Sequence, residues 1–209
     1  MSLRFANSCF MHIPRTGGMW LEEVTERLGI IRQKFKGDID AHLAWNSMPP
    51  FWRQLHPFSF IRHPWSWVRS RWSHSVEHGI AADYRHYGIN RVFDTYVMPS
   101  FADTLRKILA ENPGVVSWTF NKITEGIPRE NLRCTEDLPE AAWELLHRFE
   151  GISREQLQVI ERVLPINGTS KMDKYRLELD SVPTSIIQDF ITSEDSLVQL
   201  WQDSRMIKD

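Results

Sequence analysis

The chain has 209 residues, a net charge of −2 and two cysteines. This length suits one domain with a full hydrophobic core, and we expect residues 1–209 to form a single α/β domain. The near-neutral charge argues against general nucleic-acid binding, which is typical of strongly basic domains. Two cysteines provide neither a disulfide framework nor a four-ligand zinc site, so we expect both to be buried thiols.

No apolar run approaches the ~20 residues that a membrane-spanning helix needs. The amino terminus also lacks the charged start and long apolar stretch of a secretory signal. We therefore expect a cytoplasmic protein with neither a membrane nor a nucleic acid as partner. The oligomeric state is left open by the sequence.

A strand, a glycine-containing loop and a helix are the first predicted elements. Apolar residues at 9–13 predict a strand that ends in Pro-Arg-Thr-Gly-Gly at 14–18. The helix that follows carries its apolar residues on one face, at Trp20, Leu21, Val24 and Leu28. Glycines let the backbone approach a ligand closely, and the first amides of a helix point at an anion in the loop. Together with the positive charge of Arg15, this pattern predicts a phosphate-binding loop.

The loop differs from that of metal-dependent nucleoside-triphosphate enzymes. Their loop ends in Gly-Lys followed by a Ser or Thr that holds magnesium. Here Met19 and Trp20 follow Gly18. The sequence therefore predicts phosphate binding with no required metal and with arginine neutralising the charge.

A second strand and helix lie within residues 57–72. The apolar run at 58–61 predicts a buried strand that ends at Arg62, and Pro64 is typical of the first turn of a helix. Ser70 follows Arg62 by eight residues. We expect a helix from Pro64 to bring the hydroxyl and the guanidinium to one anion, about two turns along.

Two irregular excursions are expected beside these motifs, at residues 30–56 and 79–99. Loops on a rigid α/β scaffold commonly carry specificity, so we expect the excursions to select the acceptor.

Later segments are mainly helical. We expect Cys134 to lie on a later strand, and we predict helices at 101–109, 141–149, 154–163 and 185–201, the last with a break near 192–193. Ser153 and Gln156 match a capping box. Strands that alternate with helices predict a mainly parallel central sheet covered by helices on both faces, with the ligand at the carboxyl ends of the strands.

The two motifs together resemble those of the sulfotransferases that use 3'-phosphoadenosine 5'-phosphosulfate (PAPS). In that family the first motif runs Pro-Lys-Ser/Thr-Gly-Gly/Thr-Thr, and the second has Arg-x-Pro with a Ser eight residues after the Arg. Weaker similarity at 131–138, 149–152 and 167–171 extends the resemblance over most of residues 8–200. It implies a three-layer P-loop-type fold, PAPS as co-substrate and transfer of a sulfuryl group to a hydroxyl or amine of a small-molecule or glycan acceptor.

The resemblance also implies roles for individual residues. The first loop would hold the 5'-phosphosulfate, and Arg62 and Ser70 would hold the 3'-phosphate. Lys171 would be a further phosphate contact. The implied loop contacts are Arg15, Thr16, Gly17, Gly18, Met19 and Trp20.

Two loop positions depart from the family pattern. Arg15 stands where the family has its catalytic lysine, and Met19 stands where a hydroxyl residue is usual. Arginine is a planar fork and lysine a compact point charge, so Arg15 would stabilise the leaving phosphate with a different geometry.

Sulfuryl transfer needs a base that takes the proton from the acceptor. Histidine suits this role because its pKa lies near working pH. We predict His42, which lies between the first helix and the Arg62 strand, with Glu22 or Glu23 as the competing assignment. The other seven histidines are expected to be structural or solvated.

Two alternatives to a sulfotransferase stay open. The first is a catalytically weak nucleotide-binding protein on the same scaffold, which would bind nucleotide without transfer. The second is a P-loop nucleotide kinase, which would turn over ATP with magnesium.

Overall fold

The computed structural model describes residues 2–35, 44–79, 89–163 and 174–206. The strands are β1 (Ser2–Arg4), β2 (Ser8–Phe10), β3 (Gln33–Phe35), β4 (His56–Ile61) and β5 (Leu132–Cys134). The helices are α1 (Gly18–Arg27), α2 (Pro64–Glu77), α3 (Phe101–Glu111), α4 (Val115–Thr124), α5 (Glu140–Glu150), α6 (Arg154–Arg162), α8 (Arg176–Asp180), α9 (Thr184–Ser193) and α10 (Asp195–Met206). Short 3-10 helices are η1 (Trp45–Ser47), η3 (Ile89–Tyr96), η4 (Arg129–Asn131) and η5 (Thr135–Asp137).

The five strands form one mixed sheet in the order β3-β1-β2-β4-β5. The central pairs β2–β4 and β4–β5 are parallel, as expected for an α/β fold. However, β1 runs antiparallel to both of its neighbours, β2 and β3. The prediction of a mainly parallel sheet therefore holds for the centre only, because a tight turn folds β1 back along β2.

Side chains alternate between the two faces of this sheet. Phe10, Phe58 and Phe60 point to one face, where they pack with apolar residues of α1, α5 and α6. Cys9 and Ile61 belong to the cluster on the other face, which includes residues of α4 and α10. Helices therefore cover both faces, as the sequence predicts.

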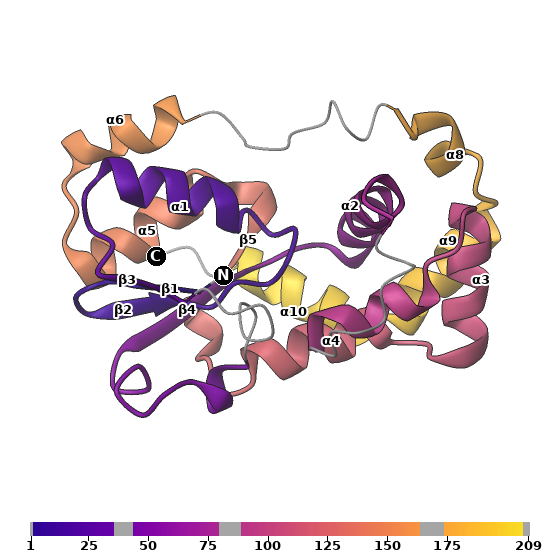
Figure 1. Ribbon diagram of the computed structural model, residues 1–209, viewed down its shortest axis with the longest axis horizontal. Coiled ribbons are helices and arrows are strands. Elements are labelled where there is room, and N and C mark those ends of the chain that lie inside the picture. Colours follow the sequence, from indigo (N-terminus) through magenta and orange to yellow (C-terminus); the bar gives the residue numbers. More distant parts are fainter. Residues whose placement is uncertain (1, 36–43, 80–88, 164–173, 207–209) are drawn as a thin grey trace.

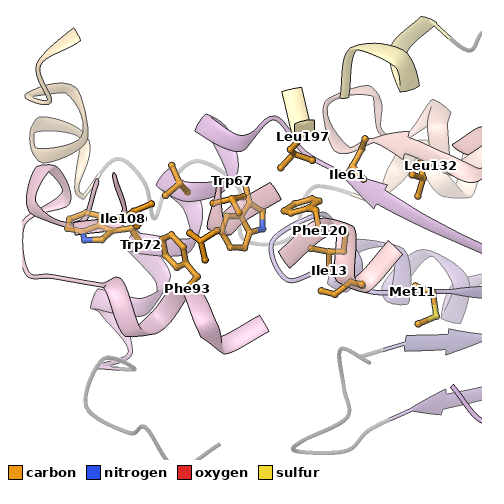
Figure 2. Packing of buried hydrophobic residues seen from close by; sticks show 14 of the residues in the cluster. Met11, Ile13, Ile61, Trp67, Trp72, Phe93, Ile108, Phe120, Leu132 and Leu197 are labelled. Carbon is orange, nitrogen blue, oxygen red and sulfur yellow. The ribbon is translucent and has the colours of Figure 1, made fainter. Parts of the chain in front are cut away.

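The second cluster extends beyond the sheet into a group of helices. Figure 2 shows it running from Met11 and Leu132 near the strands, through Trp67 and Phe120, to Trp72 and Ile108. In Figure 1, α2, α3 and α9 lie past the end of the sheet toward which β4 runs. The carboxyl end of β4 therefore lies where the sheet meets the helical group.

Most predicted helices are confirmed. The capping box at Ser153 and Gln156 is present, and the predicted break near 192–193 separates α9 from α10. Two predictions of irregular structure were incomplete, because β3 lies within residues 30–56 and η3 lies within residues 79–99. The sequence analysis also missed β1 and α4.

Both cysteines are buried thiols, as expected. Burial is the main cause that raises the pKa of Cys9 and of Cys134 to about 12. Across the described ranges, no helix has the length and apolarity needed to cross a membrane.

Candidate functional site

The loop between β2 and α1 makes a sharp turn at the carboxyl end of β2. Arg15 has φ 67° and Gly17 has φ 85°, so two residues of the loop adopt the left-handed region. Only glycine enters this region without strain from a Cβ atom. Gly17 is also the residue before α1, and the first amides of that helix have no acceptor within the helix itself.

Close packing explains both glycines. A Cβ atom at Gly17 would lie 2.7 Å from Cδ1 of Leu138, and one at Gly18 would lie 2.1 Å from the His12 ring. The loop therefore fits against β2 and the segment after β5 only because these positions lack side chains. The His12 ring lies directly against this loop.

Three other loop residues differ in what their side chains can offer a ligand. The Thr16 hydroxyl is buried and donates to the Ile13 carbonyl at 2.7 Å. Trp20 is 6% exposed, and its indole donates to the Val163 carbonyl at 2.8 Å. Both side chains hold the fold together, so an anion could meet these two residues only at their backbone amides. Met19, in contrast, is 52% exposed.

The second motif lies directly against the first. Arg62 follows β4, and its guanidinium donates to the Arg15 carbonyl at 3.1 Å. The Arg15 Nε in turn donates to the Ser70 hydroxyl on α2 at 3.0 Å. Arg62 is 47 residues and Ser70 is 55 residues from Arg15 along the chain. The structure therefore brings three distant residues together.

Two positive charges share this half-buried space. Burial is the largest cause that lowers the pKa of Arg15, and the nearby charges of Arg62 and Arg71 lower it further. Burial also lowers the pKa of Arg62, against the opposing effect of Glu136. Among the residues that the structure describes, Arg15 forms no ion pair. An anion bound between the two guanidinium groups would relieve their repulsion.

Glu136 is a site residue that the sequence analysis did not assign. It follows β5, and its carboxylate lies 4.0 Å from Arg62 Nε. The same carboxylate accepts from the His63 amide at 3.2 Å and from the Trp201 indole at 3.0 Å. Glu136 thus links the second motif to α10. The only signal in the sequence was its place just after a predicted strand.

Comparisons with models of known protein families, with curated proteins and with solved structures found no match for this chain. The resemblance to sulfotransferases is therefore carried by the short motifs quoted above.

Two predicted site residues, His42 and Lys171, lie outside the described residues. The alternative bases Glu22 and Glu23 lie on α1, where each forms an ion pair. Glu22 pairs with Lys34 of β3, and Glu23 with Arg27, both at 2.7 Å. Neither carboxylate has a contact with the Arg15 loop among the interactions of the described residues.

Two further features concern ligands. Within the described ranges, no three His, Cys, Asp or Glu side chains are grouped to hold a metal ion.

A hollow of about 400 Å³ is lined by residues of α4 and α10, by Arg129 and by Leu132. Because Leu132 begins β5, this hollow lies at the amino end of the strand. It is distinct from the Arg15 and Arg62 site, which lies at the carboxyl ends of β2 and β4.

Proposed function

We propose that this protein is a PAPS-dependent sulfotransferase with a P-loop-type fold. Its β2–α1 loop would hold the 5'-phosphosulfate group, and Arg62 and Ser70 would hold the 3'-phosphate. The acceptor would be a hydroxyl or amine of a small molecule or glycan.

The convergence of the two motifs carries this proposal. Each motif alone is a short pattern, but Arg15 contacts Ser70 through its side chain and Arg62 through its carbonyl. The two guanidinium groups stand close together at the carboxyl ends of parallel strands, where α/β folds bind ligands. Two phosphate groups of one nucleotide would satisfy this arrangement.

Arg15 would act on the leaving group. Its Nε donates to Ser70, so its two terminal nitrogens would be the groups that bind a phosphate. Together with the first amides of α1, they would stabilise the negative charge that grows on the 5'-phosphate as the sulfur–oxygen bond breaks. This preorganised charge would accelerate transfer without moving any part of the loop.

Calorimetric titration with adenosine 3',5'-bisphosphate (PAP) tests the proposal, alongside ADP with and without magnesium. We expect tighter binding of PAP, independent of magnesium. Preference for ADP with magnesium would favour the kinase alternative. No binding of either nucleotide would reject the site.

Arg62→Gln and Arg69→Gln form a matched pair for this titration. We expect Arg62→Gln to weaken PAP binding by roughly 10- to 100-fold, the loss of one or two hydrogen bonds to a charged group. Arg69 lies on α2, the helix that follows Arg62, but it pairs with Asp180 at 2.9 Å, so its replacement should leave the affinity nearly unchanged. An equal loss of PAP affinity in both variants would mean that PAP responds to the overall positive charge and not to a specific contact with Arg62.

A further inference from the structure

Helix α2 presents one side to the phosphate loop. The Trp67 indole donates to the Pro14 carbonyl at 2.7 Å, and Ser70 accepts from Arg15. Both partners belong to the loop between β2 and α1. The side of α2 that carries Trp67 and Ser70 therefore faces the candidate site.

His74 lies on this same side of α2, one turn further along. Residues four apart in a helix share a face, and one turn advances about 5.4 Å along the axis. The side chain is half-buried. Burial lowers the pKa of Arg15, and the carboxylate of Glu77, one more turn along α2, partly opposes this effect. The charge of Glu77 therefore acts on Arg15, and His74 lies between Ser70 and Glu77 on this face of α2.

The adjoining side of α2 is held in place by a buried network. Arg71 Nε donates to Asp94 of η3 at 3.0 Å, and Ser75 donates to the same carboxylate oxygen at 2.9 Å. Arg71 and Asp94 are each about 7% exposed at the side chain. Because this network fixes the rotation of α2, it also fixes the direction in which His74 projects.

We propose that His74 is the general base that takes the proton from the sulfuryl acceptor. This inference rests on the proposed function and assigns to a residue of α2 the role that the sequence analysis gives to His42. The sequence analysis expects His74 to be structural or solvated.

The step conserves its atoms and electrons. The acceptor O–H gives its proton to an imidazole nitrogen of His74, and the oxygen forms a new bond to sulfur. The bond between sulfur and the bridging oxygen of PAPS breaks, and its electron pair stays on the 5'-phosphate of PAP, beside Arg15. The imidazolium then returns the proton to solvent.

The spacing along α2 suits this step. A reacting pair of atoms stands about 3–3.5 Å apart, and a base must come within about 2.6–3.2 Å of the acceptor atom. One helical turn separates Ser70, which contacts Arg15, from His74. An acceptor placed between His74 and Arg15, which would bind the 5'-phosphate, would have the base on one side and the leaving group on the other.

Three matched variants test the assignment: His74→Asn, His56→Asn and His42→Asn. His56 is the control, because it is an exposed histidine at the amino end of β4, whereas the candidate site lies at the carboxyl end of that strand. The readouts are PAP release from PAPS, with water and with a panel of simple phenols and sugars as acceptors, and PAP affinity by calorimetry.

We expect His74→Asn to slow PAP release by at least about 100-fold, as for loss of a general base, with PAP affinity almost unchanged. His56→Asn should change neither quantity. Wild-type turnover in His74→Asn, or loss confined to His42→Asn, would overturn the inference. The free energy of unfolding of each variant is measured as well, so that a loss of turnover caused by loss of folding is recognised.

A footprint that needs no turnover separates this inference from the proposed function. Diethyl pyrocarbonate modifies accessible histidines, and mass spectrometry locates the modified residues. We expect saturating PAPS to protect His74 and to leave the exposed His56 reactive. PAPS binding without protection of His74 would refute the inference alone, whereas absence of PAPS binding would refute the proposed function as well.

Discussion

Arg15 combines an unfavourable backbone conformation with an unfavourable charge environment. It is the one described residue other than glycine with a positive φ, at 67°. Its half-buried guanidinium also lies near the charges of Arg62 and Arg71. Strained residues persist where the surrounding structure holds them, and they cluster at functional sites. We interpret Arg15 as a residue whose cost in the free protein is offset when an anion binds.

Replacing Arg15 by glycine or by alanine separates these two costs. Both changes remove the guanidinium, but only glycine adopts the left-handed conformation without strain. We therefore expect Arg15→Gly to be more stable than Arg15→Ala by about 1 kcal/mol, measured by urea unfolding. Both variants should lose PAP affinity. Equal stabilities would show that the loop changes its backbone conformation once the arginine is gone.

Among the helices, α4 depends on a group supplied by the junction of α9 and α10. Glu194 is fully buried, and its carboxylate accepts from the amides of Val116 and Ser117 at 3.1 and 2.6 Å. These amides lie in the first turn of α4, where helices lack internal acceptors and favour negative charge. Glu194 thereby joins two helical segments that lie far apart in the sequence.

This carboxylate predicts a pH dependence of stability. Burial raises the pKa of Glu194 above its usual 4.5, although the hydrogen bonds from Ser117 and Val116 act in the opposite direction. The folded state then binds the proton more tightly than the unfolded state, so this contribution to stability falls as pH rises from 4.5 through the raised pKa.

Glu194→Gln supplies the comparison, because glutamine does not titrate. We expect the stability of the wild type, relative to Glu194→Gln, to decrease as pH rises from 4 toward 8, as measured by urea unfolding at each pH. A relative stability that increases over this range would show that the amide hydrogen bonds outweigh burial.

On the scale of the whole molecule, the candidate site lies where the sheet meets the helical group. The Arg15 loop follows β2, Arg62 follows β4, and Ser70 lies on α2 (Figure 1). Strands β2 and β4 contribute side chains to both hydrophobic clusters, one on each face of the sheet. A ligand at this place would contact segments that pack into both clusters.

Ligand binding should therefore raise global stability. At a PAP concentration about 100 times its Kd, we expect the free energy of unfolding to rise by about 2.7 kcal/mol. The same concentration should stabilise Arg62→Gln much less, because its Kd is higher. An equal effect on both proteins would indicate that PAP binds somewhere other than between Arg15 and Arg62.

Local patterns in the sequence were enough to predict most helices and the strands β2, β4 and β5. Apolar periodicity, Pro64 and the Ser153 capping box act within a few residues, so α2, α5 and α6 could be recognised without knowing their neighbours. The spacing of Arg62 and Ser70 likewise follows from helix geometry, because both flank a single helix start.

Only the tertiary structure decided which side chains face the ligand. The sequence does not show that Trp20 is buried against Val163, that Glu136 approaches Arg62, or that the Ser70 side of α2 meets the Arg15 loop. It also does not show the reversed direction of β1, whose three residues carry too short a pattern. These features depend on contacts between segments that are distant in the chain, and such contacts are set by the packing of the whole core.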